Sequence, residues 1–120
     1  MFSWFKKEKK RSPSKEEILN AGLKMALEWG ENWLKPIQGR LSKAYPDLKV
    51  EELNKYNSSC QAAMKFGCDT VYEMAERYGK ETKQKEFEAI FLQRYPWVNE
   101  KNLSHIFSQG MYYAWKDFGL

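Results

Sequence analysis

The longest uninterrupted helical pattern lies in the middle of the chain and constrains its fold most. From Val50 to Tyr78 no proline occurs, and apolar or small residues recur every three or four positions. This spacing is typical of one face of an α-helix. A helix of these 29 residues would be ~44 Å long, so the remaining elements must pack along it. The positions that carry the pattern are Leu53, Tyr56, Cys60, Ala63, Gly67, Val71, Met74 and Tyr78.

Shorter helical patterns precede and follow this central segment. Ser14 and Glu17 have the spacing of a capping box, which predicts the start of the first helix. Gly30 is expected to end that helix, because glycine takes the left-handed conformation at low cost. Pro36 must lie in the first turn of the second helix or kink it, since proline lacks an N–H. The predicted ranges are about 14–30, 32–44, 82–94 and 99–118.

Two blocks of the first half of the chain recur in the second half. The blocks that match at an offset of 49 residues are Met25-Ala26-x-x-Trp29-Gly30 and Met74-Ala75-x-x-Tyr78-Gly79. Those that match at an offset of 50 residues are Tyr45-Pro46 with Leu53 and Tyr95-Pro96 with Leu103. A duplicated unit accounts for both matches; the alternative is coincidence among residues that commonly end helices.

These patterns predict an all-α fold. We expect a compact five-helix bundle built from two similar halves of about 50 residues, 18–67 and 68–120, that share the long central helix. Residues 14–120 would form this single domain, and residues 1–13 would precede it as a tail. A chain of 120 residues has the usual length of one domain.

The net charge of +4 is concentrated at the N-terminus. The first eleven residues carry five basic side chains and one acidic side chain, whereas the other 109 residues carry 15 of each sign. Because phosphate binding strengthens with the number of cations presented, the body is not expected to bind nucleic acid. An accessory protein that binds nucleic acid through its basic tail is the alternative.

The tail combines aromatic rings with basic side chains. Rings can lie at the depth of the lipid headgroups while cations meet anionic lipid, so we hypothesise that the tail binds an anionic membrane surface. The alternatives are a tail without a binding role and one whose rings fold back onto the bundle. The candidate membrane-binding residues are Phe2, Trp4, Phe5, Lys6, Lys7, Lys9, Lys10 and Arg11.

The chain shows no secretory signal and no apolar segment long enough to span a membrane. Cys60 and Cys68 fall in one predicted helix, about 12 Å apart along its axis, which is too far for a disulfide. We therefore predict free thiols and a cytoplasmic location. Attachment to the inner membrane surface through the tail is a second hypothesis.

Signals for catalysis are weak. His105 is the one histidine, and its helical position predicts a solvated side chain on the outer face. Cys60 is expected in the core and Cys68 at a partly exposed position. No set of three or four converging metal ligands can be assembled, so we predict no cofactor, no metal and no enzymatic activity. A small enzyme with an unrecognised site is the alternative.

The last helix is apolar on more sides than one core contact requires. Met111, Tyr112 and Trp115 lie away from its core stripe. Either the tail or another helix covers this side, or it is a contact surface, since aromatic side chains dominate protein interfaces. We therefore predict a non-catalytic protein-interaction module that binds a protein partner or forms a homodimer.

Overall fold

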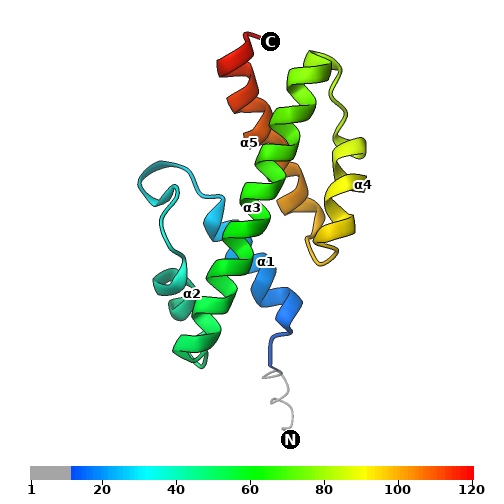
Figure 1. Cartoon of the computed structure of the whole chain (residues 1–120). Coiled ribbons are helices and arrows are strands. Elements are labelled where there is room, and N and C mark those ends of the chain that lie inside the picture. The colour runs from blue at the N-terminus through cyan, green and yellow to red at the C-terminus, as the bar shows by residue number, and fades with distance from the viewer. Residues whose placement is uncertain (1–11) are drawn as a thin grey trace, which may run out of the picture.

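The computed structural model describes residues 12–120, and this part of the chain is helical without any strand. The prediction of an all-α fold is therefore confirmed (Figure 1). Two short 3-10 helices, η2 (Gly30–Asn32) and η3 (Gly79–Glu81), lie between the longer elements. The longer elements of this range are five α-helices: α1 (Lys15–Ala26), α2 (Gln38–Ala44), α3 (Val50–Tyr78), α4 (Gln84–Arg94) and α5 (Glu100–Phe118).

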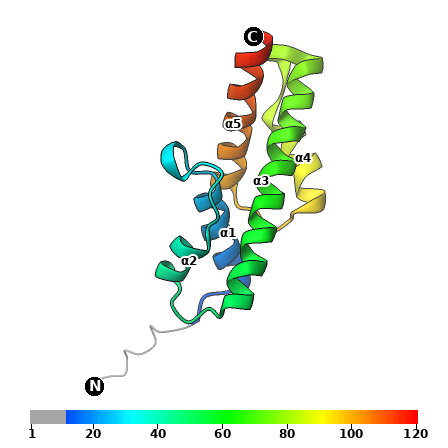
Figure 2. The same cartoon turned by 60° about the vertical axis from the view of Figure 1, so that its left-hand side comes forward.

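Helix α3 forms the axis of the molecule. Helices α1 and α2 pack along its N-terminal half, and α4 and α5 pack along its C-terminal half (Figures 1 and 2). The molecule measures 60 × 27 × 22 Å, and its radius of gyration is 17.0 Å, whereas a compact domain of this length has about 13 Å. The bundle is thus elongated along α3 rather than compact.

Helix α5 crosses α3 at two points where a glycine replaces a side chain. A Cβ atom at Gly110 would lie 2.5 Å from Cβ of Val71, and one at Gly67 would lie 2.6 Å from Cγ2 of Ile106. No real Cβ atom tolerates such distances, so the absence of a side chain allows the close packing. Gly67, at the centre of α3, therefore marks a helix crossing.

The core extends along both halves of α3. Its largest fully buried side chains include Phe87 and Phe91 from α4 and Ile37 and Leu41 from the α2 region. Burial of each such side chain stabilises the fold by roughly 1.5–3 kcal/mol. The short helices α2 and α4 are held mainly by these contacts, because isolated helices of this length are marginal in water.

Several predicted boundaries agree with the structure. Helix α3 has the predicted bounds, and the capping box is formed: the Glu17 N–H donates to Oγ of Ser14 at 3.1 Å, and the Ser14 N–H donates to Glu17 Oε1 at 3.4 Å. Tyr45 and Tyr95 are the C-caps of α2 and α4, so these helices end at residues 44 and 94 as predicted. Asn99 caps α5 by accepting the Asn102 N–H at 2.9 Å.

The prediction was wrong in the segment between α1 and α2. Helix α1 ends at Ala26, four residues before Gly30, and α2 begins only at Gln38. Residues 27–37 form a loop that contains η2, with Leu34 in the left-handed region at φ 66°. Pro36 explains part of the difference, since it disfavours the helical conformation at the preceding residue and supplies no N–H.

Candidate functional site

Five aromatic side chains from the 27–37 loop and α5 form one continuous surface, which we call the aromatic surface. Its two tryptophans from the loop stack on each other, with ring centroids 5.2 Å apart. The Trp29 ring lies 5.5 Å from that of Tyr112 and 5.8 Å from that of Tyr113. Trp115 extends the surface, with its ring 6.0 Å from that of Tyr112. The members are Trp29, Trp33, Tyr112, Tyr113 and Trp115.

Much of the aromatic surface remains open to solvent. Trp29, Tyr112 and Trp115 expose 47, 43 and 55% of their surface. Two of these were predicted as contact residues from the pattern of the last helix. Met111, the third predicted contact residue, is only partly exposed and packs against the core. The structure therefore places two loop tryptophans, and not Met111, beside the rings of Tyr112 and Trp115.

The two loop tryptophans were missed because both fall inside the predicted helical ranges 14–30 and 32–44. The structure ends α1 before Trp29 and begins α2 after Trp33, so neither lies on the core face of a helix, although Trp33 packs against the core from the loop. Pro36, together with Gly30 six residues before it, was the available signal. A glycine and a proline so close together favour a loop over a helix.

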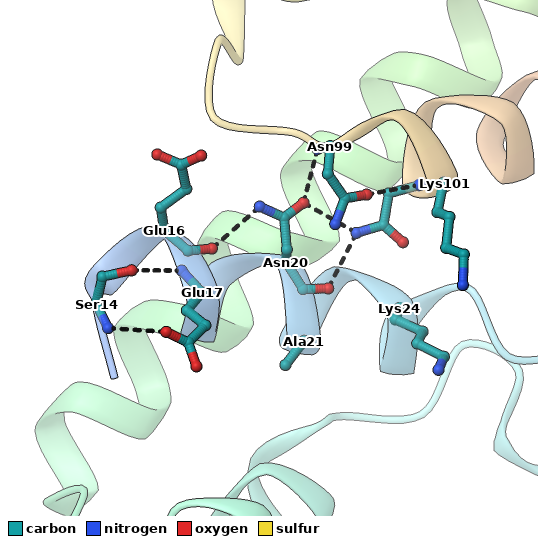
Figure 3. A pocket seen from close by; sticks show the side chains of 9 residues that line it. Ser14, Glu16, Glu17, Asn20, Ala21, Lys24, Asn99 and Lys101 are labelled. Atoms are coloured by element: carbon teal, nitrogen blue, oxygen red, sulfur yellow. Dashed lines mark hydrogen bonds between the residues drawn. The ribbon is translucent and has the colours of Figure 1, made fainter. Parts of the chain in front are cut away.

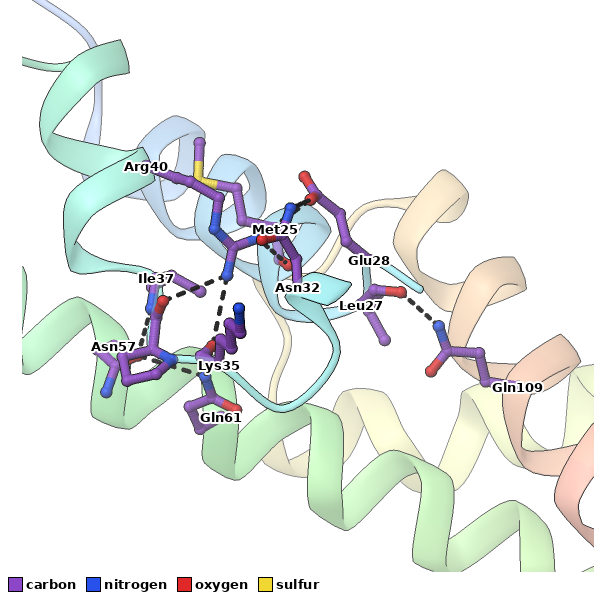
Figure 4. Close-up of polar contacts among 11 residues, drawn as sticks. Met25, Leu27, Glu28, Asn32, Lys35, Ile37, Arg40, Asn57, Gln61 and Gln109 are labelled. Atoms are coloured by element: carbon purple, nitrogen blue, oxygen red, sulfur yellow. Dashed lines mark hydrogen bonds and ion pairs between the residues drawn. The ribbon is translucent and has the colours of Figure 1, made fainter. Parts of the chain in front are cut away.

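Arg40 of α2 fixes the loop, because its guanidinium group contacts oxygen atoms at both ends of the loop (Figure 4). One guanidinium nitrogen donates to the Met25 carbonyl at 2.8 Å and lies 3.2 Å from a Glu28 carboxylate oxygen. The other donates to the carbonyls of Lys35 and Pro36 at 3.4 and 3.2 Å. Arg40 therefore joins the beginning of the loop to its end.

Amide side chains tie the same loop to the long helices (Figure 4). The Ile37 N–H donates to Oδ1 of Asn57 at 3.0 Å, and Gln61 of α3 donates to the Lys35 carbonyl at 3.2 Å. Buried Gln109 of α5 donates to the carbonyl of Leu27, where α1 ends. Because these bonds come from α3 and α5, they hold the loop tryptophans over α5.

His105 lies one helical turn before Gln109 and is partly buried, so the prediction of a solvated outer histidine was wrong. Its Nε2 lies 3.2 Å from the Gln109 side-chain nitrogen. Since an amide N–H only donates, Nε2 must accept, which requires neutral imidazole. Burial lowers the pKa of His105 from its ordinary value, which favours the same neutral form.

A cavity of about 600 Å³ opens beside the aromatic surface, between α3, α5 and the loop; we call it the α3–α5 cavity. Trp33 and Tyr113 belong both to its lining and to the aromatic surface. Met64 and Cys68 contribute further apolar wall from α3, and Asp69 and Asp117 bring carboxylates. The cavity has the size and the mostly apolar lining of a small-molecule site.

Neither cysteine has the properties of a nucleophile. Both thiols are free; Cys60 is fully buried, as predicted, and Cys68 is partly exposed. Burial raises the pKa of each thiol to about 12, so both remain protonated at neutral pH. A reactive cysteine instead needs a lowered pKa.

In a polar depression between the N-termini of α1 and α5, asparagine side chains of the lining form hydrogen bonds within the chain (Figure 3). Asn20 donates to the Trp97 carbonyl at 2.8 Å and accepts from the Asn99 N–H at 2.8 Å. The nearly buried Asn102 amide donates to Oδ1 and to the carbonyl of Asn20, both at 3.0 Å. These polar groups already have partners, so this cluster joins α1 to α5 and is a structural feature.

The candidate membrane-binding residues Phe2, Trp4, Phe5, Lys6, Lys7, Lys9, Lys10 and Arg11 lie outside the described residues. Within residues 12–120, no helix has the length and apolar character needed to cross a membrane. The same range contains no group of three or more histidine, cysteine, aspartate or glutamate side chains that could hold a metal ion.

Comparisons with protein-family models, with curated protein sequences and with solved structures gave no match to this chain.

Proposed function

We propose that this protein is a non-catalytic interaction module that binds a protein partner through the aromatic surface. The observation that carries the proposal is the contact of five aromatic rings, from the loop and from α5, across one partly exposed face. Tryptophan and tyrosine contribute most of the binding energy of protein interfaces, because they bury a large area and lose few degrees of rotational freedom. Single exposed apolar residues are normal, whereas contiguous patches mark interaction sites.

The hydrogen bonds that fix the loop support this proposal. A surface held in its binding conformation loses less conformational entropy when the partner binds. Arg40, Asn57 and Gln109 each contribute to holding the loop that carries Trp29 and Trp33. An aromatic cluster that served only the core would not need to remain half exposed.

Site-specific photo-crosslinking in cells tests the proposal. A photoreactive phenylalanine analogue placed at Trp115 is expected to capture one defined protein. The matched control is Tyr78, which exposes 49% of its surface at the end of α3, outside the aromatic surface. Trp29→Ala should weaken binding of the purified partner at least about tenfold, while Tyr78→Ala should leave it unchanged. Equal capture from positions 115 and 78, or none, would contradict the proposal.

A homodimer is the other occupant considered for this surface. Light scattering of the wild type and of Trp115→Ala distinguishes the two cases. A mass of two chains that falls to one chain in the variant would identify the partner as a second copy. A mass of one chain in both proteins leaves a different protein as the partner.

For the tail, we propose reversible attachment to the inner surface of the cytoplasmic membrane. The support is the sequence of residues 1–11, where three aromatic residues are followed by five basic ones; each cation near an anionic surface is worth about 1 kcal/mol. Deleting residues 1–11 should abolish sedimentation with vesicles of anionic lipid. Unchanged sedimentation would refute the hypothesis, and a steep salt-dependent affinity for nucleic acid, lost on the same deletion, would favour the accessory-protein alternative.

We also propose that the domain arose by duplication of a helical unit. Two buried pairs at the repeat offsets support this: Ile37 with Phe87, and Leu41 with Phe91. At a further pair of equivalent contacts, the small and the larger residue have changed places between the two helices. In the first half, Gly22 of α1 faces Cys60 of α3; the equivalent positions of the second half hold Val71 and Gly110, which also face each other. Compensating exchange of a small and a larger side chain is expected where two copies keep one helix crossing.

A further inference from the structure

The walls of the α3–α5 cavity suit an apolar ligand body. The rings of Trp33 and Tyr113 are nearly parallel, at 25°, with centroids 6.2 Å apart. Met64 lies on the α3 side and Leu34 on the loop side. The volume of about 600 Å³ matches a small organic molecule. Aromatic faces also carry negative electrostatic potential, so they attract cations placed against them.

Among residues 12–120, the charged groups that line the cavity leave the negative charge of Asp117 without an ion pair. Lys65 donates to Asp69 at 2.9 Å, and this ion pair neutralises both side chains. Asp117 accepts a hydrogen bond of 2.5 Å from the Tyr72 hydroxyl, which is a neutral donor. Within residues 12–120, no ion pair joins Asp117 to a lysine or arginine. Its carboxylate is therefore available to a cationic ligand.

The neighbouring groups strengthen this preference for a cation. Asp117 lies in the last turn of α5, where the unsatisfied carbonyl groups of the helix add negative potential. The hydrogen bond to Asp117 raises the pKa of Tyr72, and burial raises the pKa of Cys68, so both remain neutral at pH 7. An anionic ligand would meet a carboxylate and electron-rich rings, and no unpaired cation of the lining.

We propose that the α3–α5 cavity binds a small organic cation, with its ammonium group beside Asp117 and its apolar body between Trp33, Met64 and Tyr113. The ammonium donates to the free lone pairs of the carboxylate, and the body displaces water from the apolar walls. Binding of a cation in this cavity is independent of the proposed function, because it does not require the aromatic surface to have a protein partner.

The test uses the full chain and three probes that share a phenylethyl body and differ in the charge of the terminal group. Phenethylammonium carries the cation, 2-phenylethanol is neutral, and 3-phenylpropanoate is the anion. Binding is measured by titration calorimetry and by NMR of the tryptophan indole N–H signals. Phenethylammonium is expected to bind at least about tenfold more tightly than the alcohol, with no binding of the anion. The Trp33 signal should shift, and that of Trp115, outside the cavity lining, should not.

Two aspartate variants test whether the Asp117 carboxylate is the group that binds the cation. Asp117→Asn should reduce the affinity for phenethylammonium to that of the alcohol, while Asp47→Asn, remote from the cavity, should not change it. Circular dichroism establishes whether each variant is folded. If Asp117→Asn is not folded, high salt with the wild type provides the same comparison, because it should weaken binding of the cation and leave binding of the alcohol unchanged. Equal affinity for cation and alcohol, no effect of the aspartate change, or absence of binding by all three probes would overturn the proposal.

Discussion

At the scale of single residues, the glycines of the helix crossings determine how closely the helices pack. Gly110 faces the branched side chain of Val71, which is attached directly to the backbone of α3 and cannot move away. Gly39, near the start of α2, faces open space. The same substitution at these two positions is therefore expected to affect stability differently.

Gly110→Ala should destabilise the fold by about 1–3 kcal/mol, because the added Cβ forces α5 away from α3. Gly39→Ala should leave the stability unchanged or raise it by up to about 1 kcal/mol, since alanine favours the helix. Urea unfolding followed by circular dichroism measures both. A stability of Gly110→Ala equal to that of the wild type would show that the two helices do not approach as described.

His105 gives the fold a specific dependence on pH. Its pKa in the folded protein is lowered by burial from 6.5, so the unfolded chain takes up a proton at a higher pH than the folded chain. As the pH falls through 6.5, the unfolded state is favoured and stability decreases; above this value the contribution is complete.

The free energy of unfolding should therefore decrease between about pH 7.5 and pH 5.5, where histidine is the only side chain with an ordinary pKa. The chain contains one histidine, so His105→Gln, which cannot take up a proton in this range, should remove most of this slope. Denaturant titrations at several pH values measure it. An equal slope in the variant would mean that His105 is not buried against Gln109.

At the scale of helices and loops, the sequence predicts best where one apolar pattern continues without interruption. Helix α3 is such a case, and its bounds could be predicted because all of its buried positions face one side. The segment 27–37 could not be predicted, since Trp33 and Ile37 continue a helical spacing although they lie in a loop. That loop is stabilised by the bonds of Arg40 to Met25 and of Gln109 to Leu27, which join residues 15 and 82 positions apart, and such contacts leave no local pattern.

The same difference explains which part of the candidate site was predictable. Tyr112 and Trp115 lie on a regular helix, where the angle between side chains follows from the helical period. Trp29 and Trp33 reach this surface only because the loop folds back over α5. Their position depends on the tertiary structure of the whole domain.

Arg40→Ala should release the loop, because it removes the donors to the carbonyl groups at both ends. The backbone amides of Trp33 and Lys35, which bond within the loop at 3.0 and 3.1 Å, should exchange with solvent faster. Amides of α3 should keep their protection, and the fold should lose about 1–3 kcal/mol. Lys43→Ala on the same helix is the control. Unchanged exchange at Trp33 in Arg40→Ala would contradict the described role of the arginine.

At the scale of the whole molecule, the two pairs of helices lie along one axis and meet where α1 approaches α5. Asn102 joins Asn20 near one end of this contact, and Gln109 bonds to Leu27 near the other. The aromatic surface and the α3–α5 cavity lie on this junction, since each combines residues of the first-half loop with residues of α5. Both proposed binding sites therefore require the two halves to be joined as described.

The most direct test is proton NMR of the free protein, through nuclear Overhauser effects between aromatic rings. The structure predicts cross-peaks between Trp29 and Tyr112 and between Trp33 and Tyr113, whose ring centroids lie 5.5 and 6.2 Å apart. The core pair Phe87 and Phe107, at 6.0 Å, serves as the reference. Cross-peaks of comparable strength in all three pairs would confirm that loop and helix form one surface. Their absence in the two surface pairs, with the core pair visible, would contradict it.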